Sequence, residues 1–246
     1  MKALTVEAVA PHRTSDLSVF ARVEAWIFDL DNTLYPRNSN LFRQVDERIR
    51  AYVAKLLCVD ETEAQRIQKD FYRVHGTTLR GLMLEHDVDP DAFLEFVHDI
   101  DHSCVQPDPA LGAAILRLPG KKYIFTNGSR QHAEKVAGRL GIPKHFEDIF
   151  DIVDAQLVPK PERATYDLFV SRFGLRPDRA AMFEDLARNL VVPKAIGMTT
   201  VLVVPAGMRE VFHGEWEFEG RDDEHVDFVT DDLARFVGQV ADAIGA

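Results

Sequence analysis

Two carboxylates follow a short apolar run at residues 25–28. The run, Ala-Trp-Ile-Phe, is typical of a buried strand, and Asp29 and Asp31 come directly after it, two positions apart. Acidic side chains are costly to bury and unfavourable inside strands. Because open α/β sheets bind ligands beyond the carboxyl ends of their strands, the pair indicates a site. A solvated Asp–Asn turn that closes the strand is the plain alternative.

A second polar stretch lies at residues 122–129. Thr126 and Asn127 follow another predicted strand, and Gly128 and Ser129 lead into a helix. The free N–H groups of a helix N-terminus attract anions, and a threonine hydroxyl adds a further donor. The stretch therefore suits a phosphate, although a Thr126 that ends a strand and a Ser129 that caps a helix would leave the same pattern.

Two charged stretches complete the set. Lys160 stands between Pro159 and Pro161, whose rings restrict the backbone and so determine where the lysine side chain begins. Glu184 and Asp185 end another apolar strand, where Asp185 could also serve as a helix N-cap. Two acidic strand ends at one sheet edge repel each other unless a cation lies between them. Hard oxygen ligands with open positions suit Mg²⁺.

The spacing of apolar residues predicts the elements that carry these side chains. Strands are expected at residues 25–28, 122–126, 149–153, 180–183, 200–204 and 228–230. Helices between and after them are expected at residues 109–118, 129–140, 162–173, 186–196 and 231–244. This alternation predicts a parallel sheet with helices on both faces.

Between the first strand and the rest of the sheet lies a block without any strand pattern. Helices are predicted there at residues 41–56, 60–74, 78–86 and 90–100. A block of about seventy residues is too long for a loop, so we expect a small four-helix domain over the carboxyl edge of the sheet. The expected organisation is therefore a flexible lead-in at 1–21, a core at 22–36 and 107–246, and the helical domain at 37–106, with an irregular excursion at 207–224.

In order and strand context, the four stretches resemble the motifs of the haloacid dehalogenase-like (HAD) hydrolase superfamily. Those motifs are Asp-x-Asp-x-Thr, a Ser or Thr, a Lys and an acidic pair, and the likeness extends over residues 25–204. The resemblance implies an α/β fold, with a Rossmann-like parallel sheet core and a helical cap domain inserted after the first strand. It also implies hydrolysis of phosphomonoesters through a covalent aspartyl phosphate.

The resemblance assigns a role to each acidic motif residue. Asp29 would be the nucleophile, and Asp31 would protonate the leaving oxygen and then activate water. Mg²⁺ would be held by Asp29, the backbone carbonyl of Asp31 and Asp185. Glu184 would lie in or near the layer behind these ligands.

Phosphate recognition falls to three further residues in this assignment. Thr126, the backbone N–H of Asn127 and Lys160 would bind the phosphoryl oxygens, and Lys160 would also take part in catalysis. A phosphate dianion repels a carboxylate nucleophile until Mg²⁺, a lysine and backbone N–H groups neutralise it. An acid at Asp31 separates the chain from the dehalogenases of the superfamily, whose halide leaves unaided. A phosphomutase would carry the same core residues, so that alternative stays open.

Two shorter strings give an expectation for the substrate. Leu34-Tyr35-Pro36, and His-Gly-Thr-Thr-Leu-Arg-Gly-Leu at residues 75–82, resemble the pyrimidine 5′-nucleotidase branch, which hydrolyses UMP and CMP. The acidic pair departs from that branch, which often has Asp-Asp. Candidate substrate contacts are Tyr35, Phe42, Thr77, Thr78 and Arg80. Structural alternatives stay open, with Thr77 as a helix cap, Arg80 as a solvated side chain and Phe42 in the core of the cap.

Composition bounds the partners and the compartment. The chain has 246 residues, 46% of them hydrophobic, and a formal net charge of −11. This charge argues against a nucleic-acid polymer or an anionic membrane as partner. A small phosphorylated metabolite can still bind, because local positive groups or a metal ion can outweigh the net charge within a pocket. Cys58 and Cys104 lack metal-type spacing and are expected to be buried, reduced thiols. The sequence has no long apolar run and no signal-type segment, so we expect a cytoplasmic protein.

Three functional hypotheses follow. The first is a Mg²⁺-dependent phosphatase of pyrimidine 5′-nucleotidase type, acting on a nucleoside monophosphate. The second is a sugar-phosphate phosphatase or a phosphomutase of the same superfamily. The third is a catalytically silent binding protein on this scaffold, which would be expected to lack Asp29, Asp31, Lys160 or Asp185, and all four are present.

Overall fold

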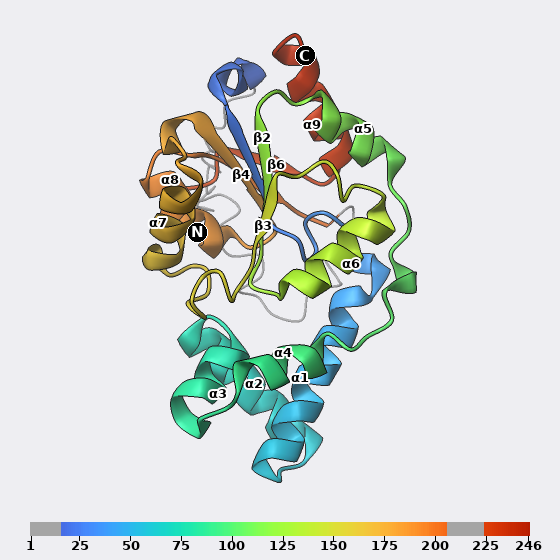
Figure 1. The fold of residues 1–246 in the computed structure, drawn as a ribbon, viewed down its shortest axis with the longest axis vertical. Coiled ribbons are helices and arrows are strands. Elements are labelled where there is room, and N and C mark those ends of the chain that lie inside the picture. Colours follow the sequence, from blue (N-terminus) through green and yellow to red (C-terminus); the bar gives the residue numbers. More distant parts are fainter. Residues whose placement is uncertain (1–15, 206–223) are drawn as a thin grey trace, which may run out of the picture.

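The computed structural model describes residues 16–205 and 224–246. Its centre is one sheet of six parallel strands (Figure 1). Across the sheet the strands lie in the order β3 (Asp148–Phe150), β2 (Lys121–Phe125), β1 (Ala25–Phe28), β4 (Ala180–Glu184), β5 (Thr199–Val203) and β6 (Phe228–Thr230). The prediction of an α/β fold with a Rossmann-like parallel sheet is confirmed.

Strand β1 lies inside the sheet and is buried on both faces. It pairs with β2 on one side and with β4 on the other. Alternate residues of a strand point to opposite faces, so Trp26 and Phe28 enter one hydrophobic cluster and the other two residues enter a second. The pairing continues to Asp29, whose N–H donates to a β4 carbonyl at 2.9 Å. The backbone of the first acid is thus held by the sheet itself.

Helices cover both faces of the sheet, as the alternation of elements predicts. One face packs against α5 (Pro109–Arg117), α6 (Arg130–Leu140) and α9 (Leu233–Ala243), and the other against α7 (Arg163–Phe173) and α8 (Val191–Ala195) (Figure 1). The side chains of Asp108 and Ser129 accept from the first turns of α5 and α6, which explains where these helices begin. Gly141, in the left-handed conformation, ends α6.

The predicted helical insertion is present beyond the carboxyl edge of the sheet (Figure 1). It consists of α1 (Leu41–Leu57), α2 (Glu61–His75), α3 (Thr78–His86) and α4 (Pro90–Val97). These helices enclose a separate hydrophobic cluster that includes Val53, Phe71 and Leu82. Ile152, from the segment after β3, packs into the same cluster and so joins the insertion to the sheet. Helix α4 ends at Val97, before the predicted limit of residue 100.

Some predicted boundaries differ from the structure. Residues 1–15 of the expected lead-in lie outside the described residues, but Leu17–Arg22 forms a 3₁₀ helix whose Phe20 is fully buried in the core. Among the described residues, the packed core therefore includes Leu17–Arg22, most of which was assigned to the lead-in. The predicted helix at 186–196 is a 3₁₀ segment, Ala187–Leu190, followed by the short α8. The excursion expected at 207–224 lies, except for its last residue, outside the described residues.

The two cysteines differ from expectation. Cys58 is exposed and Cys104 is half-buried, so the prediction of two buried thiols is wrong, although both thiols are free. Cys58 follows the last residue of α1, in the left-handed conformation, and so lies outside the helix. Within the described ranges, every helix is too short or too polar to cross a membrane.

Candidate active site

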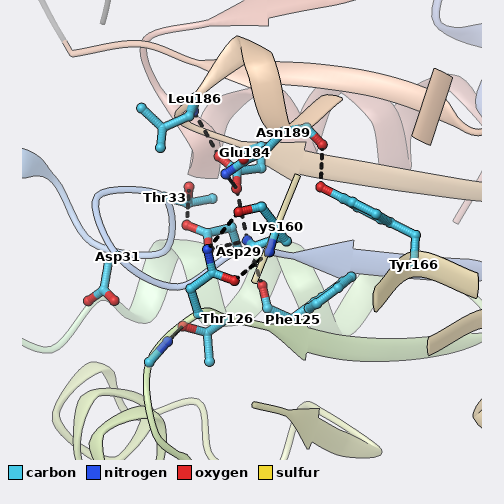
Figure 2. Close-up of polar contacts among 12 residues, drawn as sticks. Asp29, Asp31, Thr33, Phe125, Thr126, Lys160, Tyr166, Glu184, Leu186 and Asn189 are labelled. Carbon is cyan, nitrogen blue, oxygen red and sulfur yellow. Dashed lines mark hydrogen bonds and ion pairs between the residues drawn. The ribbon is translucent and has the colours of Figure 1, made fainter. Parts of the chain in front are cut away.

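The four predicted stretches converge at the carboxyl ends of β1, β2 and β4 (Figure 2). Lys160, from the loop before α7, lies at the centre of this convergence. Its ammonium nitrogen donates to Asp29 Oδ1 at 2.7 Å and to Glu184 Oε1 at 2.8 Å. It also donates to the Phe125 carbonyl at 2.9 Å. An ammonium group has three hydrogens, so each hydrogen of Lys160 already has an acceptor.

Asn127 holds the backbone of Lys160 in place. The Asn127 side chain accepts from the Lys160 N–H at 2.9 Å and donates to the Lys160 carbonyl at 3.2 Å. These two bonds tie the proline-bracketed loop to the end of β2. Burial alone would lower the pKa of Lys160, but the carboxylates of Asp29 and Glu184 outweigh burial and raise the pKa above its ordinary value. The lysine therefore stays charged.

Asp29 has a partner on each carboxylate oxygen. Oδ1 accepts from Lys160, and Oδ2 accepts from the Thr33 hydroxyl at 3.0 Å. Burial raises the pKa of Asp29 to about 7, against the opposing effect of Lys160. The negative charges of Glu184 and Asp31 add to the rise. One lysine thus does not neutralise the acids gathered around it.

Three acids lie close enough together to hold a metal ion. Ligand oxygens of Asp29, Glu184 and Asp185 are within 4.8 Å of one another. Burial and the charges of the other two acids raise the pKa of Asp185 well above its ordinary value, while the Arg37 guanidinium opposes the rise from 3.2 Å. A divalent cation would relieve this excess of negative charge, and the donors are the hard oxygen atoms that Mg²⁺ prefers. The residues present therefore fit Mg²⁺.

Glu184 is occupied by the protein itself. Its Oε1 accepts from Lys160 and also from the Asn189 side chain, at 2.6 Å. Its Oε2 accepts from the Leu186 N–H at 2.7 Å. These contacts favour Asp185 over Glu184 as a direct metal ligand. From the motif resemblance we likewise expect Asp185 as a ligand and Glu184 in the layer behind it.

The Asp31 side chain points away from Lys160 (Figure 2). Its Oδ1 accepts from the Tyr35 hydroxyl at 2.6 Å and from Nε2 of His132 at 2.9 Å. Burial would raise the pKa of Asp31, but His132 and Tyr35 outweigh burial and bring the pKa below its ordinary value. The two acids of the first motif thus have pKa values shifted in opposite directions. Such a difference is typical of sites in which two carboxyl groups have different tasks.

Backbone N–H groups at two strand ends have no acceptor among the described residues. They belong to Leu30 and Asp31 after β1 and to Asn127 after β2. Unpaired N–H groups in a protein interior are rare, and here they lie where strands end in polar side chains. The Thr126 hydroxyl accepts from the Gly128 N–H at 2.9 Å, which leaves its own hydrogen to be donated. This edge of the sheet therefore offers several donors to an anion.

The two aromatic residues predicted to contact substrate differ in their exposure. Tyr35 is only 1% exposed, and its hydroxyl is bound to Asp31. It therefore has no open ring face for a base, and the prediction that it stacks on substrate is wrong. Phe42, in the first turn of α1, is 37% exposed and so lies outside the core of the cap.

The polar side chains of the cap that were predicted to contact substrate form hydrogen bonds with other protein groups. The Thr77 hydroxyl accepts from the Arg80 N–H and so caps α3, which was the structural alternative for this residue. The buried Thr78 hydroxyl donates to the Gln68 carbonyl inside the cap. The Arg80 guanidinium donates to the Leu157 carbonyl of the core at 3.2 Å. In this structure the two threonines stabilise the cap, and Arg80 links the cap to the core.

Several residues of the site were not assigned a role from the sequence. They are Thr33, Arg37, His132 and Asn189, together with Tyr35 in its contact with Asp31. Thr33 belongs to the first motif and was visible there. His132 lies in the first turn of α6, after β2, and Asn189 lies in the 3₁₀ segment after β4, and this position behind a motif strand is the signal that a search for partners could have used.

The chain belongs to the haloacid dehalogenase-like hydrolases, which it matches over residues 23–197. It is 25% identical over 197 residues to phosphate metabolism protein 8 of Saccharomyces cerevisiae, covering 73% of this chain but only 61% of the yeast protein. It is 22% identical over 231 residues to glyceraldehyde 3-phosphate phosphatase of Methanocaldococcus jannaschii, covering 87% of this chain and 96% of that protein.

Solved structures share the fold. The L-2-haloacid dehalogenase of Xanthobacter autotrophicus, with chloropropionic acid covalently bound, has a TM-score of 0.53 at 18% identity, covering 89% of this chain and 98% of the dehalogenase. The fold of this chain is therefore shared with that dehalogenase. The expectation of a HAD-like hydrolase is confirmed, and its relatives include a phosphatase.

Proposed function

We propose that this chain is a Mg²⁺-dependent phosphomonoester hydrolase that works through an aspartyl phosphate on Asp29. The observation that carries the proposal is the buried ion pair of Asp29 and Lys160, 2.7 Å long, at the carboxyl end of β1. The N–H groups of Leu30 and Asp31, which follow this residue in the chain, have no acceptor among the described residues, and Asp31 is the second acid. A nucleophile, a cation, donors for an anion and an acid are the parts that phosphate ester hydrolysis needs.

In the first step an oxygen of Asp29 attacks phosphorus, and the bond between phosphorus and the leaving oxygen breaks. Asp31 gives its proton to that oxygen, so that an alcohol leaves instead of an alkoxide. The pKa of Asp31 is low in the free protein, and a phosphate dianion beside it would raise this pKa by like-charge repulsion. The products are the free alcohol and an acyl phosphate on Asp29.

In the second step Asp31 accepts a proton from water, and the water oxygen attacks the phosphorus of the acyl phosphate. The bond between Asp29 and phosphorus breaks, which regenerates the Asp29 carboxylate and releases inorganic phosphate. Asp31 is then protonated, as it was at the start. One residue thus serves as acid in the first step and as base in the second.

We propose that Asp29, the backbone carbonyl of Asp31 and Asp185 would hold Mg²⁺, with Glu184 behind them. When bound, the ion would offset the charge of the phosphoryl oxygens and so lessen their repulsion of the Asp29 carboxylate. The raised pKa values of Asp29 and Asp185 support a cation at this place, because they reflect negative charge that the protein alone does not balance.

Thr126 and the Asn127 N–H are proposed to bind phosphoryl oxygens, with Lys160 as the nearby positive charge. The three hydrogens of Lys160 are donated to protein oxygens, so a direct contact with phosphate requires one of these bonds to exchange. The main task of Lys160 in the free protein is to hold Asp29 and compensate part of its charge.

We propose a pyrimidine nucleoside monophosphate as substrate, with the helical unit at 37–106 as a cap that selects the leaving group. The likeness of Leu34-Tyr35-Pro36 and residues 75–82 to pyrimidine 5′-nucleotidases supports this choice. Thr77, Thr78 and Arg80 of the cap add no support to this choice, because their polar groups are bonded to other protein groups. A sugar phosphate is the second candidate, favoured by the similarity to the glyceraldehyde 3-phosphate phosphatase.

The test is phosphate release from a panel of nucleoside monophosphates and sugar phosphates, with Mg²⁺ and with EDTA. Mg²⁺-dependent release with a preference for UMP or CMP is the expected result. A preference for sugar phosphates would keep the chemistry and replace the substrate. Isomerisation without phosphate release would indicate a phosphomutase, and inactivity on the whole panel would favour a silent binding protein.

A further inference from the structure

Three imidazole rings meet beside Asp31, between the cap and α6. His98 follows α4 directly, His102 lies on the segment that returns from the cap to the sheet, and His132 lies in α6. The rings of His98 and His132 are stacked, with centroids 4.5 Å apart. Nδ1 of His132 lies 3.1 Å from Nε2 of His102. The mechanism above uses Asp31 but gives these rings no task.

The two ends of this cluster determine which nitrogen atoms donate. Nδ1 of His102 lies 3.1 Å from the Ile100 carbonyl, which can only accept, so this nitrogen carries a hydrogen. The ionised carboxylate of Asp31 also only accepts, so Nε2 of His132 carries a hydrogen that points to it. The His132 ring is therefore held at Nε2 by Asp31 and on one face by the ring of His98, while the contact of its Nδ1 with His102 needs one further hydrogen between the two rings.

The contact with His132 distinguishes the two oxygens of Asp31. Both Tyr35 and His132 donate to Oδ1, at 2.6 and 2.9 Å. Among the described residues, Oδ2 has no partner. His132 is fully buried, whereas the Asp31 side chain is 18% exposed. A rigid, enclosed ring thus holds one oxygen and leaves the other available to a bound ester.

We propose that His132 is a positioning residue for Asp31. This inference rests on the proposed acid–base task of Asp31. By holding Oδ1, His132 turns Oδ2 toward the leaving oxygen, while His102 and His98 hold His132 from the cap side. Correct placement matters because a displacement of about 1 Å in a catalytic group costs on the order of 10²-fold in rate. The return segment of the cap would therefore help to align an acid that belongs to the core.

Two esters with different leaving groups can distinguish the positioning of Asp31 from a merely structural task of His132. The leaving oxygen of p-nitrophenyl phosphate is stabilised by its ring and needs little help from an acid. The alkoxide of an alkyl phosphate is a poor leaving group and needs the proton from Asp31. Asp31 is also the base of the second step, which is the same for both esters, so the comparison uses kcat/KM, which reports only the first step. A misplaced Asp31 therefore lowers kcat/KM selectively for the alkyl ester, whereas a generally loosened site lowers kcat/KM for both esters.

The experiment compares the wild type with His132→Ala and His132→Gln on p-nitrophenyl phosphate and on the best alkyl phosphate of the panel. For His132→Ala we expect kcat/KM on the alkyl phosphate to fall about 10–100-fold. On p-nitrophenyl phosphate kcat/KM should fall by less than about 3-fold. His132→Gln keeps an N–H donor and should regain part of the lost rate.

Two further variants serve as comparison and control. His102→Ala removes the outer support and should show the same selectivity with a smaller loss, about 3-fold on the alkyl ester. His145→Ala, which alters a ring beside Gly112 of α5, should leave both rates unchanged. Thermal unfolding of each variant checks the fold, and His132→Gln and His102→Ala carry the test if His132→Ala does not fold.

The outcomes distinguish the inference from the proposed function. Equal losses on the two esters, or no rescue by His132→Gln, would overturn the positioning task and leave the phosphatase proposal standing. Absence of phosphate release by the wild-type protein would overturn the proposed function, and the inference with it.

Discussion

The core and the cap both bring polar side chains to the site, but they use them differently. In the core, Lys160 donates to Asp29 at 2.7 Å and to Glu184 at 2.8 Å, and the three residues come from separate segments. In the cap, the hydroxyls of Thr77 and Thr78 form hydrogen bonds with other residues of the cap. Groups held by strand ends are placed more accurately than groups on adaptable segments. The chemistry therefore belongs to the sheet edge, and the polar residues of the cap mainly build the cap.

The ion pairs of the two regions differ in the same way. The side chains of Lys160 and Asp29 are 1% and 9% exposed, whereas those of Arg66 and Asp70 on α2 are 60% and 42% exposed. An exposed pair contributes little to stability because water screens it. A buried pair is costly to break, because the remaining partner keeps an uncompensated charge. The four experiments that follow test this contrast between the core and the cap.

Replacement of the nucleophile should have the largest effect. Asp29→Asn keeps the shape of the side chain but removes the charged oxygen that attacks phosphorus. Turnover should fall by at least about 10⁴-fold, measured as phosphate release. The variant should unfold no more easily than the wild type without metal, since Asp29 is a buried acid whose pKa is raised and Lys160 keeps Glu184 as its counter-charge. Normal turnover in the folded variant would contradict the aspartyl-phosphate mechanism.

Loss of the buried lysine should affect stability as well as rate. Lys160→Met leaves Asp29 and Glu184 without their shared cation, so we expect a loss of about 3–5 kcal/mol in the free energy of unfolding, measured by urea denaturation. Arg66→Met in the cap is the matched control and should cost less than about 1 kcal/mol. Similar costs for the two variants would show that burial does not distinguish the regions.

Metal removal should act on the core alone. EDTA should abolish phosphate release, and added Mg²⁺ should restore it. Mg²⁺ should also raise the unfolding temperature of the wild type, because a ligand that binds only the folded state stabilises it. In Asp185→Asn the Mg²⁺ concentration needed for half-maximal activity should rise about 10-fold or more. A variant with unchanged Mg²⁺ dependence would remove Asp185 from the proposed ligand set.

The smallest effect is expected for a contact between the regions. Arg80→Ala removes the bond from the cap to the Leu157 carbonyl and should cost about 1 kcal/mol in the free energy of unfolding, with KM changed by less than about 3-fold. Arg73→Ala, also on the cap but paired with the exposed Asp70, is the control. A selective rise of KM by 10-fold or more in Arg80→Ala would restore Arg80 as a substrate contact.

Most elements could be predicted because their signals are local. Residues 25–28 form a strand as expected, Thr78–His86 is a helix with the expected limits, and Asp60 caps α2. The motif acids could be located for the same reason, since charged residues directly after an apolar strand are conspicuous. Predictions for the substrate contacts were weaker, because a threonine in a helix break suits a ligand and a helix cap equally well.

Sequence spacing alone led to the parallel sheet, the helical insertion and the strand ends that bear the site. Those features depend on apolar periodicity and on residues next to one another in the chain. Only the tertiary structure determined the hydrogen-bond partners of the site residues. They include the three acceptors of Lys160 and the contact of Asp31 with His132, which is 101 positions away. Hydrogen bonds of this kind depend on distance and direction in space. Tertiary packing therefore determined how each acid is held, and through burial and neighbouring charge it set their pKa values apart.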